Sequence, residues 1–360
     1  MPTNQSARLQ SLDALRGLAA LGVVLFHYLP YYDQLYTHQF ILPTGLDNAL
    51  HFGRYGVHLF FILSGFVIFM TLERTRSASW FALARALRLL PALWAGIILT
   101  SVSIHVLGPQ DRAVGLSDAL LNTVLLHEYL GLPHVDGAYW SLVVEVTFYA
   151  WIGSLFYGLK QWRHLRIALW LWLAVSYVGV IWWKSLPEYL EFPVKDLLFV
   201  KYAPLFISGM VMYRWHSRGT LPAGDRILLM LAIVHSLLAY KAPYSFFVLG
   251  CYGTFALAAS GRLQFLACRP LLWLGSLSYT LYLVHQNIGY GIIELAYANG
   301  LHGVIGVCLA LATALTLAAL IHHGVEKPCL AWFRDYRTSM TKRPDTPFPD
   351  MGQASPERER

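Results

Sequence analysis

The 360-residue chain has few charged residues, with 13% Asp, Glu, Lys and Arg against 56% hydrophobic residues. Soluble domains contain about a quarter charged residues, so a water-soluble fold of this composition would have too little polar surface. The four cysteines show neither CxxC spacing nor a pairing pattern, and we expect no disulfide framework and no metal site. We also expect no cleavable signal peptide, because the first apolar segment contains Arg16 and His27 and lacks a small-residue cleavage site.

Apolar segments run almost without interruption from Leu12 to His322. A membrane helix needs roughly 20 apolar residues, so the sequence predicts an all-α polytopic membrane protein with about ten transmembrane helices. Nine or eleven spans remain open, because the seventh and eighth segments are short. We expect one membrane domain at 1–328 and a cytoplasmic tail at 329–360, disordered from about residue 342. The predicted spans are Leu12–Leu29, Phe52–Leu72, Leu90–Leu107, Tyr139–Leu159, Leu165–Trp183, Leu197–Trp215, Arg226–Tyr240, Pro243–Ser260, Leu271–Ile293 and Leu301–His322.

The basic residues alternate between the two sides of these predicted spans. With the N-terminus inside, 20 of the 27 Lys and Arg residues lie in inner segments and five in outer segments. Cytoplasmic loops carry such an excess, so the pattern predicts cytoplasmic N- and C-termini in an inner (plasma) membrane. It also explains the net charge of +7 as a topology signal, and we expect no nucleic-acid partner.

Ionisable side chains inside predicted spans are costly in the bilayer, so each is a candidate functional residue. Arg16 and His27 are eleven residues apart in the first span. On a helix they share one face, about 16 Å apart along the axis. His58, Glu145 and His285 fall at a depth similar to that of His27 in three other spans. We therefore predict that these four groups form one layer, although a membrane histidine is also common as a helix–helix hydrogen-bonding group.

Polar neighbours extend two of these positions. Ser141 and Tyr149 lie one turn from Glu145, and Ser278 and Tyr282 share a helical stripe with His285. Arg85 and Arg88 share a helix face at the cytoplasmic entrance of the third span. They fit either a positive-inside anchor or a clamp for a phosphorylated ligand, because Arg matches phosphate bidentately. We expect His322 and His323 to be interfacial residues.

Six sequence elements, in order, resemble the membrane-bound acyltransferase 3 family and cover nearly the whole membrane region. The first is an Arg and a His separated by ten residues, and the third is an Arg-x-x-Arg element. The six are Leu12-Asp13-Ala14-Leu15-Arg16-Gly17 through Phe26-His27; Gly56 to Phe66; Arg85 and Arg88 followed by Pro91; Trp140-Ser141-Leu142 with Glu145, Phe148 and Tyr149; Leu274-Gly275 with Ser278-Tyr279 and Tyr282-Leu283-Val284-His285; and Val325-Glu326-Lys327-Pro328.

The resemblance implies transfer of an acyl group, commonly acetyl, from acyl-CoA as co-substrate to a hydroxyl of a carbohydrate or glycolipid acceptor. No bound cofactor or metal is implied. Many family members carry a fused extracytoplasmic esterase-like domain, and the short tail here leaves the transferase region to act alone or with a separate extracytoplasmic partner protein.

The layout and the resemblance together suggest roles for eleven residues. His27 is the expected general base, because a neutral imidazole can take a proton near physiological pH. A covalent acyl-enzyme through Ser64 or a histidine remains open. The expected catalytic residues are His27, Arg16 and Glu145; the expected acyl-donor-binding residues are Arg85, Arg88 and Ser64; and the expected substrate-binding residues are His58, Trp140, Tyr149, Tyr282 and His285.

Two other functional classes fit part of this pattern. A proton-coupled transporter of a small polar or acylated solute also places His, Glu and Arg within spans. The sequence shows no inverted repeat and no matched pair of broken helices, which are better indications of a carrier. A scaffold protein of an envelope pathway would not require Arg16 and His27 on one face. Acyltransfer is therefore the favoured hypothesis.

Overall fold

The computed structural model of the protein describes residues 3–75 and 77–342, and this part of the chain is helical, with no strand. Short 3-10 and π-helical turns connect many of the helices. The α-helices are α1 (Thr3–Phe26), α2 (Tyr32–Tyr36), α3 (Thr44–His51), α4 (Gly56–Arg74), α5 (Ala78–Leu107), α6 (Leu116–Asn122), α7 (Trp140–Leu159), α8 (Trp162–Ile181), α9 (Glu188–Glu191), α10 (Ala203–Arg218), α11 (Ala223–Ala239), α12 (Tyr244–Ala259), α13 (Arg269–Val284), α14 (Gln286–Ala298), α15 (Gly303–Ile321) and α16 (Lys327–Lys342).

Each of the ten predicted hydrophobic segments contains a helix, but only six helical segments of the described chain are long and apolar enough to cross a membrane. The count of about ten spans is therefore not confirmed. Helices α10 to α13 are shorter, at 16 or 17 residues each. The six are Gln10–Tyr36, Thr44–Arg74, Ala78–Leu107, Gly137–Leu159, Trp162–Ile181 and Gly303–Ser339.

The predicted ninth span, Leu271–Ile293, is not one helix. The chain bends at His285, which separates α13 from α14. The segment was predicted as continuous because its apolar residues run past His285, and hydropathy does not detect a bend. The predicted tail begins as α16 up to Lys342, and the disorder predicted beyond that point lies outside the described residues.

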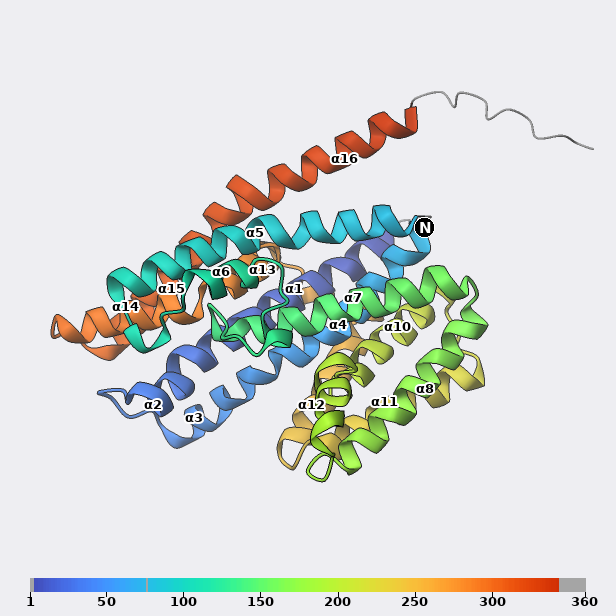
Figure 1. Ribbon diagram of the computed structural model, residues 1–360, viewed down its shortest axis with the longest axis horizontal. Coiled ribbons are helices and arrows are strands. Elements are labelled where there is room, and N and C mark those ends of the chain that lie inside the picture. The colour runs from blue at the N-terminus through green and yellow to red at the C-terminus, as the bar shows by residue number, and fades with distance from the viewer. Residues whose placement is uncertain (1–2, 76, 343–360) are drawn as a thin grey trace, which may run out of the picture.

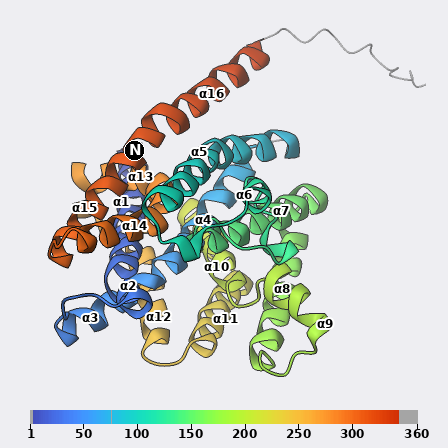
Figure 2. The ribbon, with the colours of Figure 1, turned by 60° about the vertical axis from the view of Figure 1, so that its left-hand side comes forward.

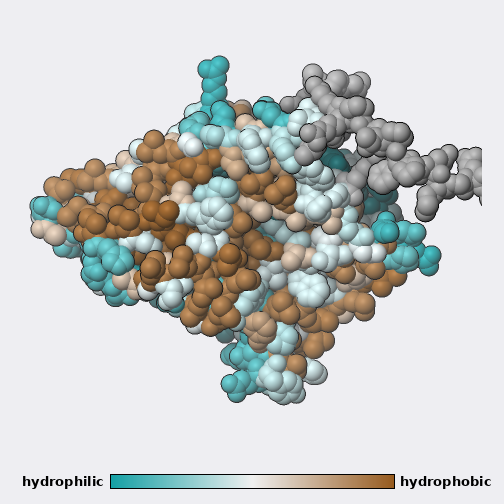
Figure 3. Space-filling view, turned by 45° about the horizontal axis from the view of Figure 1, so that its top comes forward, coloured by the Kyte–Doolittle hydropathy of each residue, from teal (hydrophilic) through white to brown (hydrophobic). Residues whose placement is uncertain are grey.

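The outward surface of the long helices is apolar. On α5, Ile98, Val102 and Val106 lie four residues apart and are all more than half exposed. In water such a stripe would be unfavourable, whereas in a bilayer it contacts lipid chains. Figure 3 shows brown, hydrophobic residues covering much of one face of the molecule. Together with the six long apolar helices, this surface indicates a membrane protein.

The helices form two neighbouring groups. Helices α1, α4, α5 and α15 run along the long direction of the molecule, with α8, α11 and α12 gathered beside them (Figure 1). Helix α16 projects from this body in both ribbon views (Figures 1 and 2). The candidate site lies in the first group, where α1, α4, α5, α7 and α13 meet.

At two helix crossings near the candidate site, a glycine lets the backbones of two helices come into direct contact. A Cβ atom at Gly65 of α4 would collide with the Phe206 carbonyl of α10, and one at Gly275 of α13 would collide with the Asp13 carbonyl of α1. Small residues let membrane helices approach to backbone contact. The first crossing fixes the neighbouring Ser64, and the second fixes the face of α1 that carries Arg16.

Gly65→Ala is expected to lower the thermal unfolding temperature of the purified protein, because α4 and α10 would have to separate. Gly158→Ala on α7 is the matched control, since nothing lies within 4 Å of the Cβ position at Gly158. Thermal unfolding in detergent compares the two. Equal unfolding temperatures for both variants would show that the close crossing is not required.

Candidate active site

A cavity of about 260 Å³ lies between the helices and contains most of the predicted polar residues. We call it the arginine cavity, because three arginines from two helices line it. Helix α4 adds Ser64, α7 adds Glu145, and α13 adds Tyr282. The polar and charged residues of its lining are Arg16, Ser64, Arg85, Arg88, Ser141, Glu145, Tyr149, Ser278, Tyr279 and Tyr282.

Glu145 is the centre of a hydrogen-bond group on one wall of this cavity. Ser64 Oγ donates to Glu145 Oε1 at 2.7 Å, and the Tyr149 hydroxyl donates to the same oxygen at 2.5 Å. Tyr149 lies one turn after Glu145, so α7 alone positions that pair. Because both hydroxyl protons point to the carboxylate, Ser64 and Tyr149 are held as donors to Glu145.

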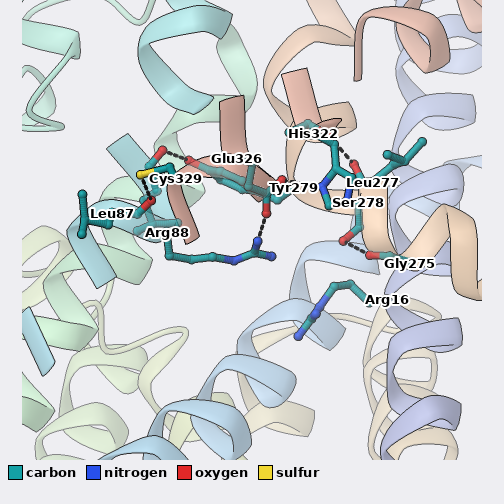
Figure 4. Close-up of polar contacts among 12 residues, drawn as sticks. Arg16, Leu87, Arg88, Gly275, Leu277, Ser278, Tyr279, His322, Glu326 and Cys329 are labelled. Atoms are coloured by element: carbon teal, nitrogen blue, oxygen red, sulfur yellow. Dashed lines mark hydrogen bonds and ion pairs between the residues drawn. The ribbon is translucent and has the colours of Figure 1, made fainter. Parts of the chain in front are cut away.

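Arg88 enters the cavity with a buried carboxylate behind it. Its guanidinium forms an ion pair with Glu326 Oε1, and His322 Nδ1 lies 2.9 Å from Glu326 Oε2. The Glu326 side chain is fully buried, whereas that of Arg88 is 29% exposed. The same guanidinium lies 5.9 Å from the centre of the Tyr279 ring. Figure 4 shows Arg88 and Arg16 pointing toward the same space from α5 and α1.

The other two arginines are less constrained. Arg16 has a long contact, 3.3 Å, with Asp13 on its own helix. Arg85 has no ion pair within the described chain, and its Nε is buried without a hydrogen-bond partner. Buried donors in native proteins usually have partners. Arg85 is therefore the guanidinium of this cavity with most capacity to bind an anion.

His27 and His285 form a pair at a neighbouring position. His285 Nε2 lies 3.1 Å from His27 Nδ1, although the two residues come from opposite ends of the chain. His27 opens a π-helical turn, His27–Tyr31, which contains Pro30. Proline has no N–H to donate in a regular helix, and single π-turns are frequent at functional sites. His285 lies at the bend between α13 and α14.

The hydrogen bonds around this pair determine which nitrogens carry protons. His285 Nδ1 lies 2.8 Å from the Tyr282 carbonyl, so it is the donor and its Nε2 is an acceptor. His27 Nδ1 faces that acceptor and also the Val23 carbonyl at 2.9 Å, so it carries the proton. This assignment follows from the network. It leaves the lone pair of His27 on Nε2, where it can accept a proton from a substrate.

A buried loop before α7 holds the His285 bend in place. Asp136 accepts hydrogen bonds at 3.0 Å from the backbone N–H groups of Ala138 and Asn287. The Asn287 side chain also donates to the Val135 carbonyl at 2.9 Å. Asn287 follows His285 by two residues, so this loop ties the start of α7 to the bend that carries His285.

Burial raises the pKa of Asp136 to about 6 from the ordinary 3.8, against the opposing effect of the two N–H donors. The folded protein therefore binds this proton more tightly than the unfolded chain does, and the contribution of Asp136 to stability falls as the pH rises from about 4 to 6. Thermal unfolding of wild type and Asp136→Asn is expected to show wild type losing stability relative to the variant across this range. A pH-independent difference would contradict this prediction.

Four of the predicted residues lie outside the arginine cavity. His27 and His285 form their own pair, which adjoins the cavity through Tyr282. His58 faces the other helix group, where its Nε2 lies 2.7 Å from the Tyr240 hydroxyl. Trp140 lines a different cavity beside Tyr202. His27 and His285 are paired, but His58 bonds to Tyr240 and Glu145 to Ser64, so the four residues predicted as one layer do not form one contiguous cluster.

The hydrogen bonds of Glu145 and Tyr282 bear on the roles predicted for these two residues. His27 is hydrogen-bonded to the side chain of His285, whereas Glu145, also expected to be catalytic, is hydrogen-bonded to Ser64 and Tyr149. The Tyr282 hydroxyl lies 2.6 Å from Ser141 Oγ and donates a hydrogen bond to the Ala138 carbonyl at 2.8 Å.

Glu326 and His322 were not predicted as site residues. His322 was expected to be interfacial, which the structure does not test, and its Nδ1 contacts Glu326 Oε2. Two features of the sequence could have indicated Glu326 as a site residue. It follows the long apolar run of the last span, and it belongs to the Val-Glu-Lys-Pro element. A carboxylate at such a position requires a buried partner, but the sequence did not show that the partner is Arg88, on α5.

Similarity to known proteins agrees with this site. The family described as an acyltransferase domain matches residues 9–323. The chain belongs to the acyltransferase 3 family. It is therefore a membrane acyltransferase that transfers groups other than aminoacyl groups. No solved structure matches it.

Three similar proteins come from different bacteria. This acyltransferase is 26% identical to nodulation protein 10 of Rhizobium leguminosarum, over 95% of this chain and 98% of that protein. It is 28% identical to the acyltransferase MdmB of Streptomyces mycarofaciens, over 90% and 92% of the two chains. It is 24% identical to the peptidoglycan O-acetyltransferase OatA of Listeria monocytogenes, over 88% of this chain and 55% of OatA.

The described residues contain no group of three or more His, Cys, Asp and Glu side chains that could hold a metal ion.

Proposed function

We propose that this acyltransferase moves an acyl group, acetyl in the simplest case, from cytoplasmic acyl-CoA to a hydroxyl of a carbohydrate or glycosylated acceptor. The observation that carries the proposal is the adjacency of a cavity with three arginines to His27, whose Nε2 has no hydrogen-bond partner among the described residues. The relatives named as an acyltransferase and a peptidoglycan O-acetyltransferase support the reaction class. The protein would lie in the inner membrane with both termini in the cytoplasm, as the distribution of Lys and Arg indicates.

The arginine cavity would bind the donor. Coenzyme A carries several phosphates, and guanidinium groups match phosphate oxygens in charge and geometry. Arg85 offers donors without an ion-pair partner within the described chain, and Arg88 is held toward the same cavity by Glu326. Ser64, fixed by Glu145, would contact the pantetheine arm or the acyl group.

The histidine pair would carry out the proton transfer. His27 Nε2 would take the proton of the acceptor hydroxyl as its oxygen attacks the thioester carbonyl. The tetrahedral intermediate would then expel the CoA thiolate, and the thiolate would take from His27 the proton that came from the acceptor hydroxyl. His285 would stabilise the imidazolium form by accepting from His27 Nδ1, a positioning role like that of the acid in a catalytic triad.

Membrane vesicles of known orientation test the proposal. Inside-out vesicles that contain the protein are expected to transfer labelled acetyl from external acetyl-CoA to carbohydrate, and right-side-out vesicles are not. Vesicles with His27→Ala serve as the control. Transfer by right-side-out vesicles alone would contradict the proposed orientation, and the absence of transfer from any acyl-CoA would contradict the proposed donor.

A further inference from the structure

A second cavity, of about 440 Å³, lies between α5 and α7. It shares Arg85, Leu89 and Tyr149 with the lining of the arginine cavity, so the two spaces are neighbours across these three side chains. We call the second space the α5–α7 groove. It is lined by the first half of α5, by α7 from Val146 to Tyr157 and by Val124, and it lies between two of the membrane-spanning segments.

Small apolar residues line the groove on both sides. Ala82 and Ala86 are one turn apart on α5, and Ala150 and Gly153 lie on α7. Helices with small residues usually pack closely in membranes, but here the groove remains between them. At one point the Phe81 ring sets the spacing, because a Cβ atom at Gly153 would lie 3.2 Å from it. The groove is therefore an apolar space of the kind that a hydrocarbon chain fills.

Two of the three side chains that the cavities share, Arg85 and Tyr149, are polar. Arg85, whose Nε lacks a hydrogen-bond partner in the described chain, and Tyr149, whose hydroxyl donates to Glu145 in the arginine cavity, lie at the boundary between the two cavities. A space with cationic groups next to an apolar groove fits an amphiphile with an anionic part and a hydrocarbon part. An acyl-CoA has both parts, and only an acyl chain longer than the two carbons of acetyl offers enough hydrocarbon to fill a groove of about 440 Å³.

We propose that the α5–α7 groove binds the hydrocarbon chain of the acyl donor, so that this enzyme transfers acyl groups longer than acetyl as well as acetyl itself. The inference rests on the proposed function, with its donor in the arginine cavity. The reaction itself is unchanged: the acyl C–S bond breaks, an acyl C–O bond forms, and CoA leaves as the thiol with the proton that the acceptor hydroxyl loses.

Binding of an acyl-CoA series tests this proposal without an acceptor. The probes are acetyl-, butanoyl-, hexanoyl- and octanoyl-CoA, titrated against the full-length protein in lipid nanodiscs. Each added methylene that enters the groove is expected to tighten binding about fourfold. Ala86→Leu and Ala150→Leu fill the groove and are expected to abolish this dependence on chain length, with acetyl-CoA binding as in wild type.

Ala312→Leu is the matched control, because Ala312 is exposed on α15 and lines neither cavity. It is expected to keep the wild-type dependence on chain length. The same dependence in wild type, both groove variants and Ala312→Leu would overturn the proposal, because it would reflect partition of the chains into the bilayer. Failure of folded wild-type protein to bind any acyl-CoA would instead overturn the proposed donor, and the groove proposal with it.

Discussion

Replacement of His27 by alanine is expected to lower the rate of acyl transfer by about 10³-fold, within the range typical for loss of a general base. The donor should still bind normally, because His27 does not line the arginine cavity. The measurement is kcat for acyl transfer together with the Kd for acyl-CoA in the same preparation. A loss of donor binding equal to the loss of rate would assign His27 to the donor site.

His105→Ala is the matched control for this experiment. His105 also lies in a long membrane helix, and its Nδ1 contacts the carbonyl one turn earlier, at Ser101, as that of His27 contacts Val23. His105 has no second histidine beside it within the described chain. It is expected to be dispensable, so a similar loss of rate in both variants would show that any membrane histidine of this kind is structural.

Replacement of His285 separates positioning from catalysis. His285→Ala is expected to reduce kcat less than His27→Ala does, because the base itself remains. His285→Gln should recover part of the rate, since its side-chain oxygen can still accept from His27 Nδ1. A purely structural role would instead predict no difference between the Ala and Gln variants in folded protein.

The second large effect concerns the arginines of the cavity. Arg88→Gln is expected to destabilise the protein by about 3 kcal/mol, because it leaves the carboxylate of Glu326 buried without its guanidinium partner. Arg85→Gln should leave stability unchanged, since Arg85 has no ion pair to lose in the described part of the chain. Both variants are expected to weaken acyl-CoA binding about thirtyfold, the scale of a hydrogen bond to a charged group.

A double variant separates the two roles of Arg88. Arg88→Gln combined with Glu326→Gln removes both buried charges, so stability should return while donor binding stays weak. Arg163→Gln, an exposed arginine on α8, is the control for a general loss of positive charge. If the double variant regained both stability and donor affinity, Arg88 would be a structural residue only.

Much of this architecture could be predicted from the sequence, because hydropathy and charge act over whole segments. The apolar runs located a helix in every predicted span, and the eleven-residue spacing of Arg16 and His27 placed Arg16 on α1 and His27 in the π-helical turn that directly follows it. Hydropathy could not detect the bend at His285, where polar backbone groups bond to Asp136 of a distant loop. Hydropathy also does not fix helix length, and α10, α11 and α12 are 16 or 17 residues long, so helix length supports six of the ten predicted spans.

The site was predicted as a set of residue types and depths, and depth does not specify neighbours. Ser64, Arg85, Arg88 and Glu145 do line one cavity, but His58 turns toward Tyr240. The rotation of each helix about its axis decides such contacts. Here the rotation depends on backbone crossings such as that of Gly275 with Asp13, which involve residues far apart in the sequence. The pairing of Arg88 with Glu326 was missed for the same reason.

The most direct test of the account is the release of free thiol from acetyl-CoA by the purified protein in nanodiscs, with a panel of glycan acceptors. We expect release that depends on an acceptor, that is lost in His27→Ala and that is retained in His105→Ala. Acceptor-dependent release at the wild-type rate by folded His27→Ala would contradict the central claim that His27 is the base of this acyltransferase.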